Sequence, residues 1–381
     1  MNLHITHDNV FIDYVIQIAH ELNVSEDRFV VYTFEEVEKL KHIKSSNVLF
    51  AKHNSARFKE LTGDLKQYKN IFIHWLEGPA ADFVNQIPNG INVIWCFWGG
   101  DGLELKHIQK KVFQPKSLKY FEQHNHNYLI DELNPKLVYQ LLKKNYRNHR
   151  AHKNHLKAIG RVNNFAHYLE EDFEIVKAAT SMRADFIPFH YAAVEDIVNV
   201  KSAVTTNGQK NILLGNSDTL SNNHFEAIDI LQKVETGNAR IYCPLSYEGG
   251  NYARDIEAYG KERLGSRFFP LLQMLPKQEY DSLLAGISCG IMNHNRSQAL
   301  GNICTLLWQG ARLYMSDNSS LYHFLKGNGC KVFSLKHDLI SHSTYLSTAL
   351  GEDDVNNNRQ VLLKLFGRIN QKKKIAAMLS L

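Results

Sequence analysis

Short apolar runs alternate with amphipathic segments along nearly the whole chain, and this alternation constrains the fold more than any other feature. The apolar run Leu3–Thr6 is followed by Val10–Leu22, whose apolar residues recur at helical spacing. Such alternation predicts a mostly parallel sheet with helices on both faces. The other first-half runs that we expect to form buried strands are Phe29–Tyr32, Asn47–Ala51, Asn70–Trp75 and Ile91–Trp98.

The same alternation restarts after the polar stretch Val198–Gln209. A chain of 381 residues is also too long for one ordinary core. We therefore predict an α/β protein with two Rossmann-like domains facing a cleft, the first at residues 1–195 and the second at 205–355. A helical tail over 356–381 is expected to pack back on the first domain. The strands expected in the second half are Asn211–Leu214, Ala239–Cys243, Arg267–Phe269, Ile287–Met292, Arg312–Met315 and Lys331–Phe333.

The composition indicates a soluble globular protein, with 44% hydrophobic and 22% charged residues. The five cysteines are scattered and form no Cys-x-x-Cys pair, which favours a reducing compartment. No signal peptide is visible at the N-terminus. The longest apolar run, Ile91–Trp98, falls far short of the ~20 residues of a membrane-spanning helix. We therefore expect a cytoplasmic protein.

Positive charge is concentrated in one region. Residues 106–161 contain 13 Lys or Arg and three acids, although the whole chain carries only +5. Lys136–Lys157 has no acid and is interleaved with aliphatic residues, and Val361–Leu381 has a similar pattern, so both are expected to be basic amphipathic helices. We expect the first segment to contact an anionic membrane surface through Lys143, Lys144, Arg147 and Arg150. A solvated helix face is the alternative.

The strongest candidate site follows the strand Asn211–Leu214. Ligands of open α/β sheets bind beyond the carboxyl ends of the strands. A glycine turn there is followed by a helix with a Ser or Asn cap, and free backbone N–H groups at such a junction favour phosphate. An ordinary capped turn is the alternative. The residues concerned are Gly215, Asn216, Ser217, Ser221 and Asn222.

Two further strand ends carry polar side chains. Ser246 and Tyr247 follow the strand that ends near Cys243, and Tyr247 could stack on a nucleobase. After Met292 the chain offers amides and a guanidinium that can contact a diphosphate in bidentate fashion. Surface loops are the alternative at both places. The second set comprises Asn293, Arg296, Gln298, Gly301 and Asn302.

Two residues of the first half are candidate proton acceptors. Asp101 follows a glycine pair after Ile91–Trp98, and we expect it to project into the cleft. Partial burial there would raise its pKa toward that of a general base. His74 ends another strand and is a parallel candidate. A solvated turn and a structural histidine are the respective alternatives.

Several common motifs are absent. The sequence contains no Asp-x-Asp, no Gly-x-x-x-x-Gly-Lys-Ser/Thr, no Gly-x-Gly-x-x-Gly and no His-Glu-x-x-His. P-loop NTPase and zinc peptidase functions therefore lose their main support. We expect neither a metal nor an organic cofactor.

The blocks Ile212–Ser217 with Ser221–His224, Cys243–Tyr247 and Arg296–Gly301 come in the expected order, and together with Phe97–Asp101 they resemble a known family. The blocks that contain Gly215–Ser217 and Trp98–Asp101 are the more specific. It is the TDP-N-acetylfucosamine:lipid II N-acetylfucosaminyltransferases of enterobacterial common antigen synthesis, or 4-alpha-L-fucosyltransferases. In place of the family's Ala-Arg-Gln-Gln-Gly-type run, this chain has Asn293–Gln298.

The resemblance implies a GT-B fold, with an acceptor-binding first domain and a TDP-sugar donor held by the second. It implies transfer of a deoxy-amino sugar to a polyprenyl-diphosphate-linked glycan at the inner face of the cytoplasmic membrane. Carried over by position, Asp101 would lie near the acceptor hydroxyl. The donor-binding residues would include Gly215, Asn216, Ser217, Asn222 and Tyr247.

Three alternatives remain open from the sequence. The enzyme could use another nucleotide sugar and acceptor on the same fold, or it could be a sugar-nucleotide 2-epimerase without a membrane-facing surface. Nucleic-acid binding through residues 106–161 would be strongly salt dependent. The aliphatic interleaving and the net negative charge of the remaining chain argue against it, so no nucleic-acid partner is expected.

Overall fold

The computed structural model describes residues 1–23, 26–105, 107–126, 150–198, 211–246, 250–341 and 350–381. These residues form two compact units. The first contains Met1–Ile108, the described part of Tyr128–Ala193, and Arg368–Leu381. The second contains the described part of Gln109–Asn127 together with that of Val194–Gly367.

The first unit contains, within the described residues, a seven-stranded parallel sheet in the order β3-β2-β1-β4-β5-β6-β7. The order reverses between β1 and β4, which are direct neighbours. The strands are β1 (Asn2–His7), β2 (Arg28–Thr33), β3 (Leu49–Lys52), β4 (Asn70–His74), β5 (Asn92–Cys96), β6 (Asn164–His167) and β7 (Asp185–Pro188).

Helices connect these strands, as parallel pairing requires. Residues 150–159 are also helical. The bounded helices of this unit are α1 (Ile12–Glu21), α2 (Ala56–Thr62), the 3₁₀ turn η1 (Leu65–Gln67), α3 (Pro79–Val84), α4 (Gly100–Leu103), α8 (Glu170–Ala179) and α17 (Arg368–Leu379).

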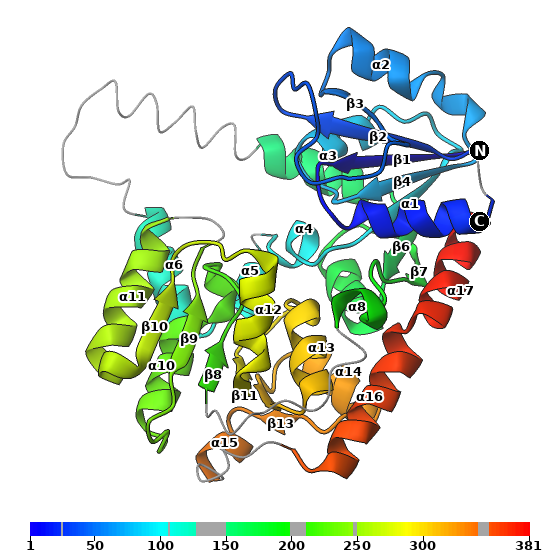
Figure 1. Cartoon of the computed structure of the whole chain (residues 1–381). Coiled ribbons are helices and arrows are strands. Elements are labelled where there is room, and N and C mark those ends of the chain that lie inside the picture. Colours follow the sequence, from blue (N-terminus) through cyan, green and yellow to red (C-terminus); the bar gives the residue numbers. More distant parts are fainter. Residues whose placement is uncertain (24–25, 106, 127–149, 199–210, 247–249, 342–349) are drawn as a thin grey trace, which may run out of the picture. The chain divides into compact units, whose positions relative to one another are not determined.

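Helix α17 packs beside α1 on the first sheet (Figure 1). The apolar stripe of α1 includes Ile12 and Val15, both fully buried, and Ile375 and Met378 of α17 join the same core cluster. The side-chain amide of Asn2 donates to the backbone oxygen of Leu379 at 3.1 Å. The chain's two ends are thus fastened together within this unit.

The second unit contains, over the residues that the structure describes, a six-stranded parallel sheet in the order β10-β9-β8-β11-β12-β13. Its order reverses between β8 and β11. The strands are β8 (Asn211–Leu214), β9 (Ile241–Pro244), β10 (Phe268–Leu271), β11 (Ile287–Met292), β12 (Arg312–Met315) and β13 (Phe333–Ser334).

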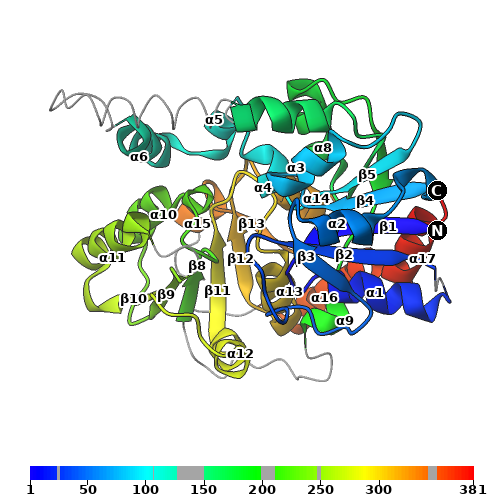
Figure 2. The same cartoon turned by 90° about the horizontal axis from the view of Figure 1, so that it is seen from above.

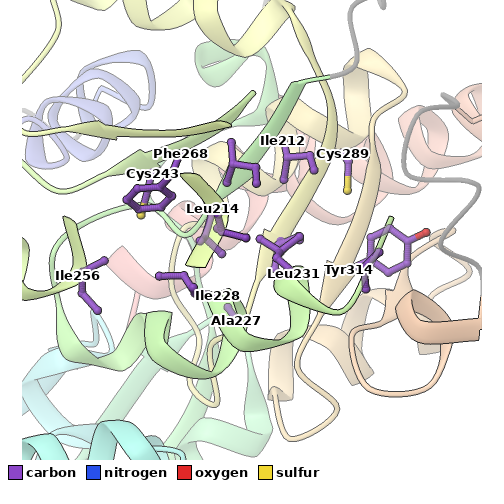
Figure 3. Packing of buried hydrophobic residues seen from close by; sticks show 14 of the residues in the cluster. Ile212, Leu214, Ala227, Ile228, Leu231, Cys243, Ile256, Phe268, Cys289 and Tyr314 are labelled. Atoms are coloured by element: carbon purple, nitrogen blue, oxygen red, sulfur yellow. The ribbon is translucent and has the colours of Figure 1, made fainter. Parts of the chain in front are cut away.

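Helices flank this sheet as well (Figure 2). Apolar residues of β8, β9, β11 and α10 fill one side of its core, where Leu231 and Ile228 lie beside Leu214 (Figure 3). The helices are α5 (Gln109–Val112), α6 (Pro115–His126), α9 (Val194–Ile197), η2 (Leu220–Asn222), α10 (His224–Gln232), α11 (Asn251–Leu264), η3 (Gly265–Arg267), α12 (Lys277–Ala285), α13 (Leu300–Gln309), α14 (Ser320–Gly327), α15 (Asp338–Ser341) and α16 (Glu352–Phe366).

The observed units differ from the predicted boundaries of 1–195, 205–355 and 356–381 in two places. Residues 109–126 belong to the second unit, because Lys116 and Ser117 donate backbone N–H groups to the Glu226 carboxylate of α10. The predicted tail is not one helix either. It is interrupted at Gly367, where a Cβ would lie 2.3 Å from the Leu363 oxygen. The boundary between the units falls at this residue, and therefore α16 belongs to the second unit and only α17 to the first.

The structure describes only part of the segment predicted to contact a membrane. Lys143, Lys144 and Arg147 lie outside the described residues, whereas Arg150 is exposed at the start of the helical residues 150–159. None of the described helices is both long enough and apolar enough to span a bilayer.

Candidate functional site

Polar side chains converge at the carboxyl ends of β8 and β11, where the strand order of the second sheet reverses. This reversal is the point at which open α/β sheets bind ligands. The two strand ends are joined directly, because the backbone N–H of Gly215 donates to the Ile291 oxygen at 2.9 Å. The residues predicted at Gly215–Asn222 and at Asn293–Gln298 are thereby brought together.

Gly215 is required by both conformation and space. Its φ of +69° is one that residues with a Cβ rarely adopt. A Cβ at this position would lie 2.6 Å from Asn222 Oδ1 and 2.7 Å from His224 Nε2. The glycine therefore lets two buried polar side chains approach the end of β8.

Asn222 is the centre of the site's hydrogen-bond network and is only 1% exposed. Its Oδ1 accepts from the backbone N–H of Asn216 at 2.9 Å and lies 2.8 Å from His294 Nε2. Because the Asn216 N–H can only donate, the atom facing it must be oxygen, and His294 Nε2 must carry a proton. Asn222 Nδ2 donates to Ser217 Oγ and to Thr219.

Gln298 links the two loops from the β11 side. Its Nε2 donates to Asn216 Oδ1 at 2.9 Å, and its Oε1 accepts from Ser221 Oγ at 2.8 Å. Ser221 is 1% exposed, whereas Asn216 is half-buried. Asn216, Ser221 and Gln298 are therefore one connected set.

The residue that sequence analysis missed is Gln114. It precedes α6, in a segment from the first half of the chain, and its side chain pairs with the amide of Asn293. Its backbone N–H donates to Asn223 Oδ1 at 2.8 Å, and Asn223 Nδ2 donates to the Asn293 oxygen at 3.0 Å. Nothing in the local sequence around Gln114 signals this contact.

The other predicted donor-binding residues have more varied surroundings. Arg296 is half-buried, and its Nη1 donates to the Ser297 oxygen at 3.2 Å. Asn302 donates to the Tyr280 hydroxyl of α12 at 2.9 Å, so its amide is directed toward that helix. At Gly301 a Cβ would meet only Ile197, at 3.9 Å. Ser246 is half-buried, and Tyr247 lies outside the described residues.

Two histidines beneath this network are held neutral. Burial lowers the pKa of His224 to about 3. Burial also lowers the pKa of His294 well below its usual value, and the Arg296 charge adds to this effect. Both rings are therefore uncharged hydrogen-bonding groups at neutral pH.

Asp101, in the first unit, is more enclosed than the predicted partial burial, at 1% exposed. Its Oδ2 accepts from Trp95 Nε1 at 2.6 Å and from the backbone N–H of Leu76 at 3.0 Å. Its Oδ1 accepts from the backbone N–H of Trp98 at 3.1 Å. Burial raises the pKa of Asp101 despite these bonds, and this is the predicted direction of the shift. The geometry makes this carboxylate an anchor for two loops rather than a group facing an opening.

His74 is likewise fully buried, in a chain of hydrogen bonds. Its Nε2 lies 3.1 Å from His4 Nδ1, and its Nδ1 lies 2.7 Å from the Tyr191 hydroxyl. Trp98 Nε1 donates to the same hydroxyl at 2.7 Å, and His4 Nε2 is 3.5 Å from Asp27. Both ring nitrogens of His74 are thus occupied by internal partners.

No group of three or more His, Cys, Asp and Glu side chains arranged to hold a metal ion occurs among the residues that the structure describes. Each of the five cysteines is buried with a free thiol.

A known protein family matches the part of the chain that contains most of this network. The profile of the 4-alpha-L-fucosyltransferases, glycosyl transferase group 56, matches residues 156–348. This match covers half of the chain and contains nearly all of the network. The chain belongs to this family.

As a group 56 glycosyltransferase, the protein should share a fold with other sugar transferases, and it does. Sucrose-phosphate synthase from Thermosynechococcus elongatus aligns with a TM-score of 0.65 at 8% identity, over 100% of this chain and 98% of that one. HepE from Anabaena, in complex with UDP and glucose, aligns with a TM-score of 0.61 at 9% identity, over 100% and 99%. The trehalose-phosphate synthase of Burkholderia vietnamiensis gives 0.60 at 9% identity, over 100% of both chains. The fold is therefore GT-B, with two Rossmann-like units, and the protein is a glycosyltransferase.

Proposed function

We propose that this glycosyltransferase takes a deoxy-amino sugar of the N-acetylfucosamine type from TDP and transfers it to a polyprenyl-diphosphate-linked glycan. The reaction would belong to surface polysaccharide synthesis such as that of enterobacterial common antigen. It would take place at the inner face of the cytoplasmic membrane without a metal ion. Membership of the group 56 family supports the sugar class, and the sequence blocks that resemble the N-acetylfucosaminyltransferases support the donor and acceptor.

The observation that carries the proposal is the network at the reversal of the second sheet. Gly215 lets Asn222 and His224 pack against the end of β8, and Asn216 and Gln298 present amide groups at the same edge. Helix α13 begins immediately after this loop, and its free N–H groups favour an anionic diphosphate. Arg296 would add charge neutralisation as the leaving group departs. The Anabaena protein HepE, which has the same fold, binds UDP and glucose.

Thermal shift measurements with TDP, UDP, GDP and a short oligonucleotide test the donor class. We expect TDP to stabilise the protein most, and EDTA to leave that shift unchanged. A response to the oligonucleotide with none to any nucleoside diphosphate would refute the proposal. A shift that disappears with EDTA would refute the metal-independent part only.

An acceptor-dependence assay separates transfer from epimerisation. Purified protein is incubated with the TDP-sugar, with or without lipid-linked acceptor in vesicles that contain anionic lipid. Transfer predicts that TDP appears only with acceptor. Conversion of the free TDP-sugar to a sugar epimer, without acceptor, would establish the epimerase alternative instead.

A further inference from the structure

Aromatic side chains gather at the carboxyl edge of the first sheet, around the strands between which the strand order reverses. Trp75 directly follows β4, Trp98 follows β5, and Phe11 directly precedes α1. The Trp98 ring centroid lies 5.9 Å from that of Trp75 and 5.0 Å from that of Phe11. His7, the last residue of β1, lies 5.4 Å from Trp98. We call Phe11, Trp75, Trp98 and His7 the aromatic cluster.

The cluster is not part of the buried core. Trp95, which lies on β5 three residues before Trp98, is fully buried, whereas Trp75 and Trp98 are half-buried and Phe11 is 41% exposed. Large aromatic surface left accessible at the ligand-binding edge of a sheet is typical of a binding site.

Trp75 is held in a strained conformation. Its φ of +77° is an outlier for a bulky residue. Gly100 lies against its ring, since a Cβ there would come within 3.0 Å of the indole. Strain of this kind is maintained by surrounding structure and concentrates at binding and active sites.

Trp98 is fixed by hydrogen bonds behind it. Its indole N–H donates to the Tyr191 hydroxyl, which bonds in turn to His74 and, through it, to His4. Because this chain of bonds uses the polar edge of Trp98, a ligand would contact its ring rather than its N–H group. A ring fixed in advance loses little entropy when it binds.

His7 provides a polar group beside these rings. Its Nδ1 is buried and has no hydrogen-bond partner among the described residues, although nearly all buried polar atoms have one. The neighbouring carboxylate of Asp8 does not serve it, because that group accepts from the backbone N–H groups of Lys41, His42 and Ile43.

We propose that the aromatic cluster binds a hexopyranose ring of the acceptor glycan. The indole faces of Trp75 and Trp98 would contact the C–H face of the sugar, and His7 would bond to one of its hydroxyl groups. A lipid chain would need only the apolar rings, and it would not use a fixed hydrogen-bonding group. The assignment of this sugar to the acceptor rests on the proposed function, whereas sugar binding itself is measurable without it.

Intrinsic fluorescence is a direct probe, because Trp75, Trp95 and Trp98 lie in this unit and only Trp308 lies in the other. We would titrate the full-length protein with the methyl glycosides of glucose and N-acetylglucosamine. Cyclohexanol serves as an apolar ring of similar size. We expect a saturable change with a glycoside and none with cyclohexanol. No change with either glycoside, or an equal response to cyclohexanol, would overturn the proposal.

Variants locate the binding. Trp98→Ala is expected to weaken glycoside binding at least about tenfold, as truncation of a central aromatic contact does. Tyr191→Phe keeps every ring but releases the Trp98 N–H, and should weaken binding about threefold. Ile369→Ala, which truncates a side chain that is 89% exposed on α17, should bind like the native protein. Native affinity in both Trp98→Ala and Tyr191→Phe would refute the site.

The TDP thermal shift keeps the two proposals separate. A protein that binds TDP but no glycoside would refute the aromatic site alone. A protein that binds the glycoside through Trp98 but no nucleoside diphosphate would retain the site and refute the proposed function.

Discussion

The side-chain amides of Gln114 and Asn293 bond to each other in both directions. Gln114 Nε2 donates to Asn293 Oδ1 at 2.7 Å, and Asn293 Nδ2 donates to Gln114 Oε1 at 3.2 Å. Asn293 is 2% exposed, so its amide has little access to water. A segment from the first half of the sequence thus completes the site at the end of β11.

Gln114→Ala should remove this pairing and leave the Asn293 amide partly unsatisfied. We expect the free energy of unfolding to fall by about 1–3 kcal/mol, measured by urea denaturation. TDP affinity should also fall, because Asn293 lies next to the proposed donor site. Gln123→Ala, at an exposed position on the adjoining helix α6, is the matched control and should be nearly neutral. Equal stabilities for both variants would contradict the structural role of Gln114.

Gly215→Ala should be far more disruptive than Gly237→Ala. Both glycines have positive φ, +69° and +54°, so both substitutions incur the conformational cost of roughly 1–2 kcal/mol. Only at Gly215 would the new Cβ also meet side chains, since nothing lies within 4 Å of a Cβ at Gly237. The comparison therefore isolates the steric effect. We expect TDP binding to be lost in Gly215→Ala and kept in Gly237→Ala, and equal loss in both would argue against the proposed donor site.

Acidification should destabilise the protein in part through His224. Burial lowers its folded pKa from 6.5 to about 3. Between these values the unfolded chain binds more protons than the folded one, so stability falls as pH decreases below the unfolded pKa. At about pH 5 this residue alone costs about 2 kcal/mol relative to neutral pH.

The measurement compares urea denaturation at about pH 7.5 and about pH 5 in the native protein and in His224→Gln. The loss on acidification should be smaller in the variant by about 2 kcal/mol. His124→Gln, at an exposed position, should lose as much stability as the native protein. Identical losses in all three proteins would show that His224 already accepts a proton in the folded state at pH 5.

Asp101→Asn tests whether this residue anchors loops or accepts a proton from substrate. An amide has one acceptor oxygen where the carboxylate has two, so its NH₂ group would face an N–H donor of Leu76, Trp95 or Trp98. We expect the free energy of unfolding to fall by about 1–3 kcal/mol, with unfolding monitored by tryptophan fluorescence. Asp185→Asn, exposed on β7, is the control. Native stability combined with a large loss of turnover would instead support Asp101 as the general base.

The sequence by itself determined the two α/β units and the strands that frame the site in the second unit. Local periodicity places the expected strands over β1–β5 and β8–β13, although it missed β6 and β7. Because parallel strands align their carboxyl ends, this pattern also brought together Asn216, Asn222 and Gln298.

Tertiary structure alone decided which partners those residues have. The pairing of Gln114 with Asn293, the enclosure of Asp101 and the break of the tail at Gly367 all depend on contacts between distant segments. A local pattern states whether a residue faces a core or water, since periodicity reflects only burial. It does not state which buried polar group meets which donor, because that follows from packing geometry, and packing geometry fixed the site.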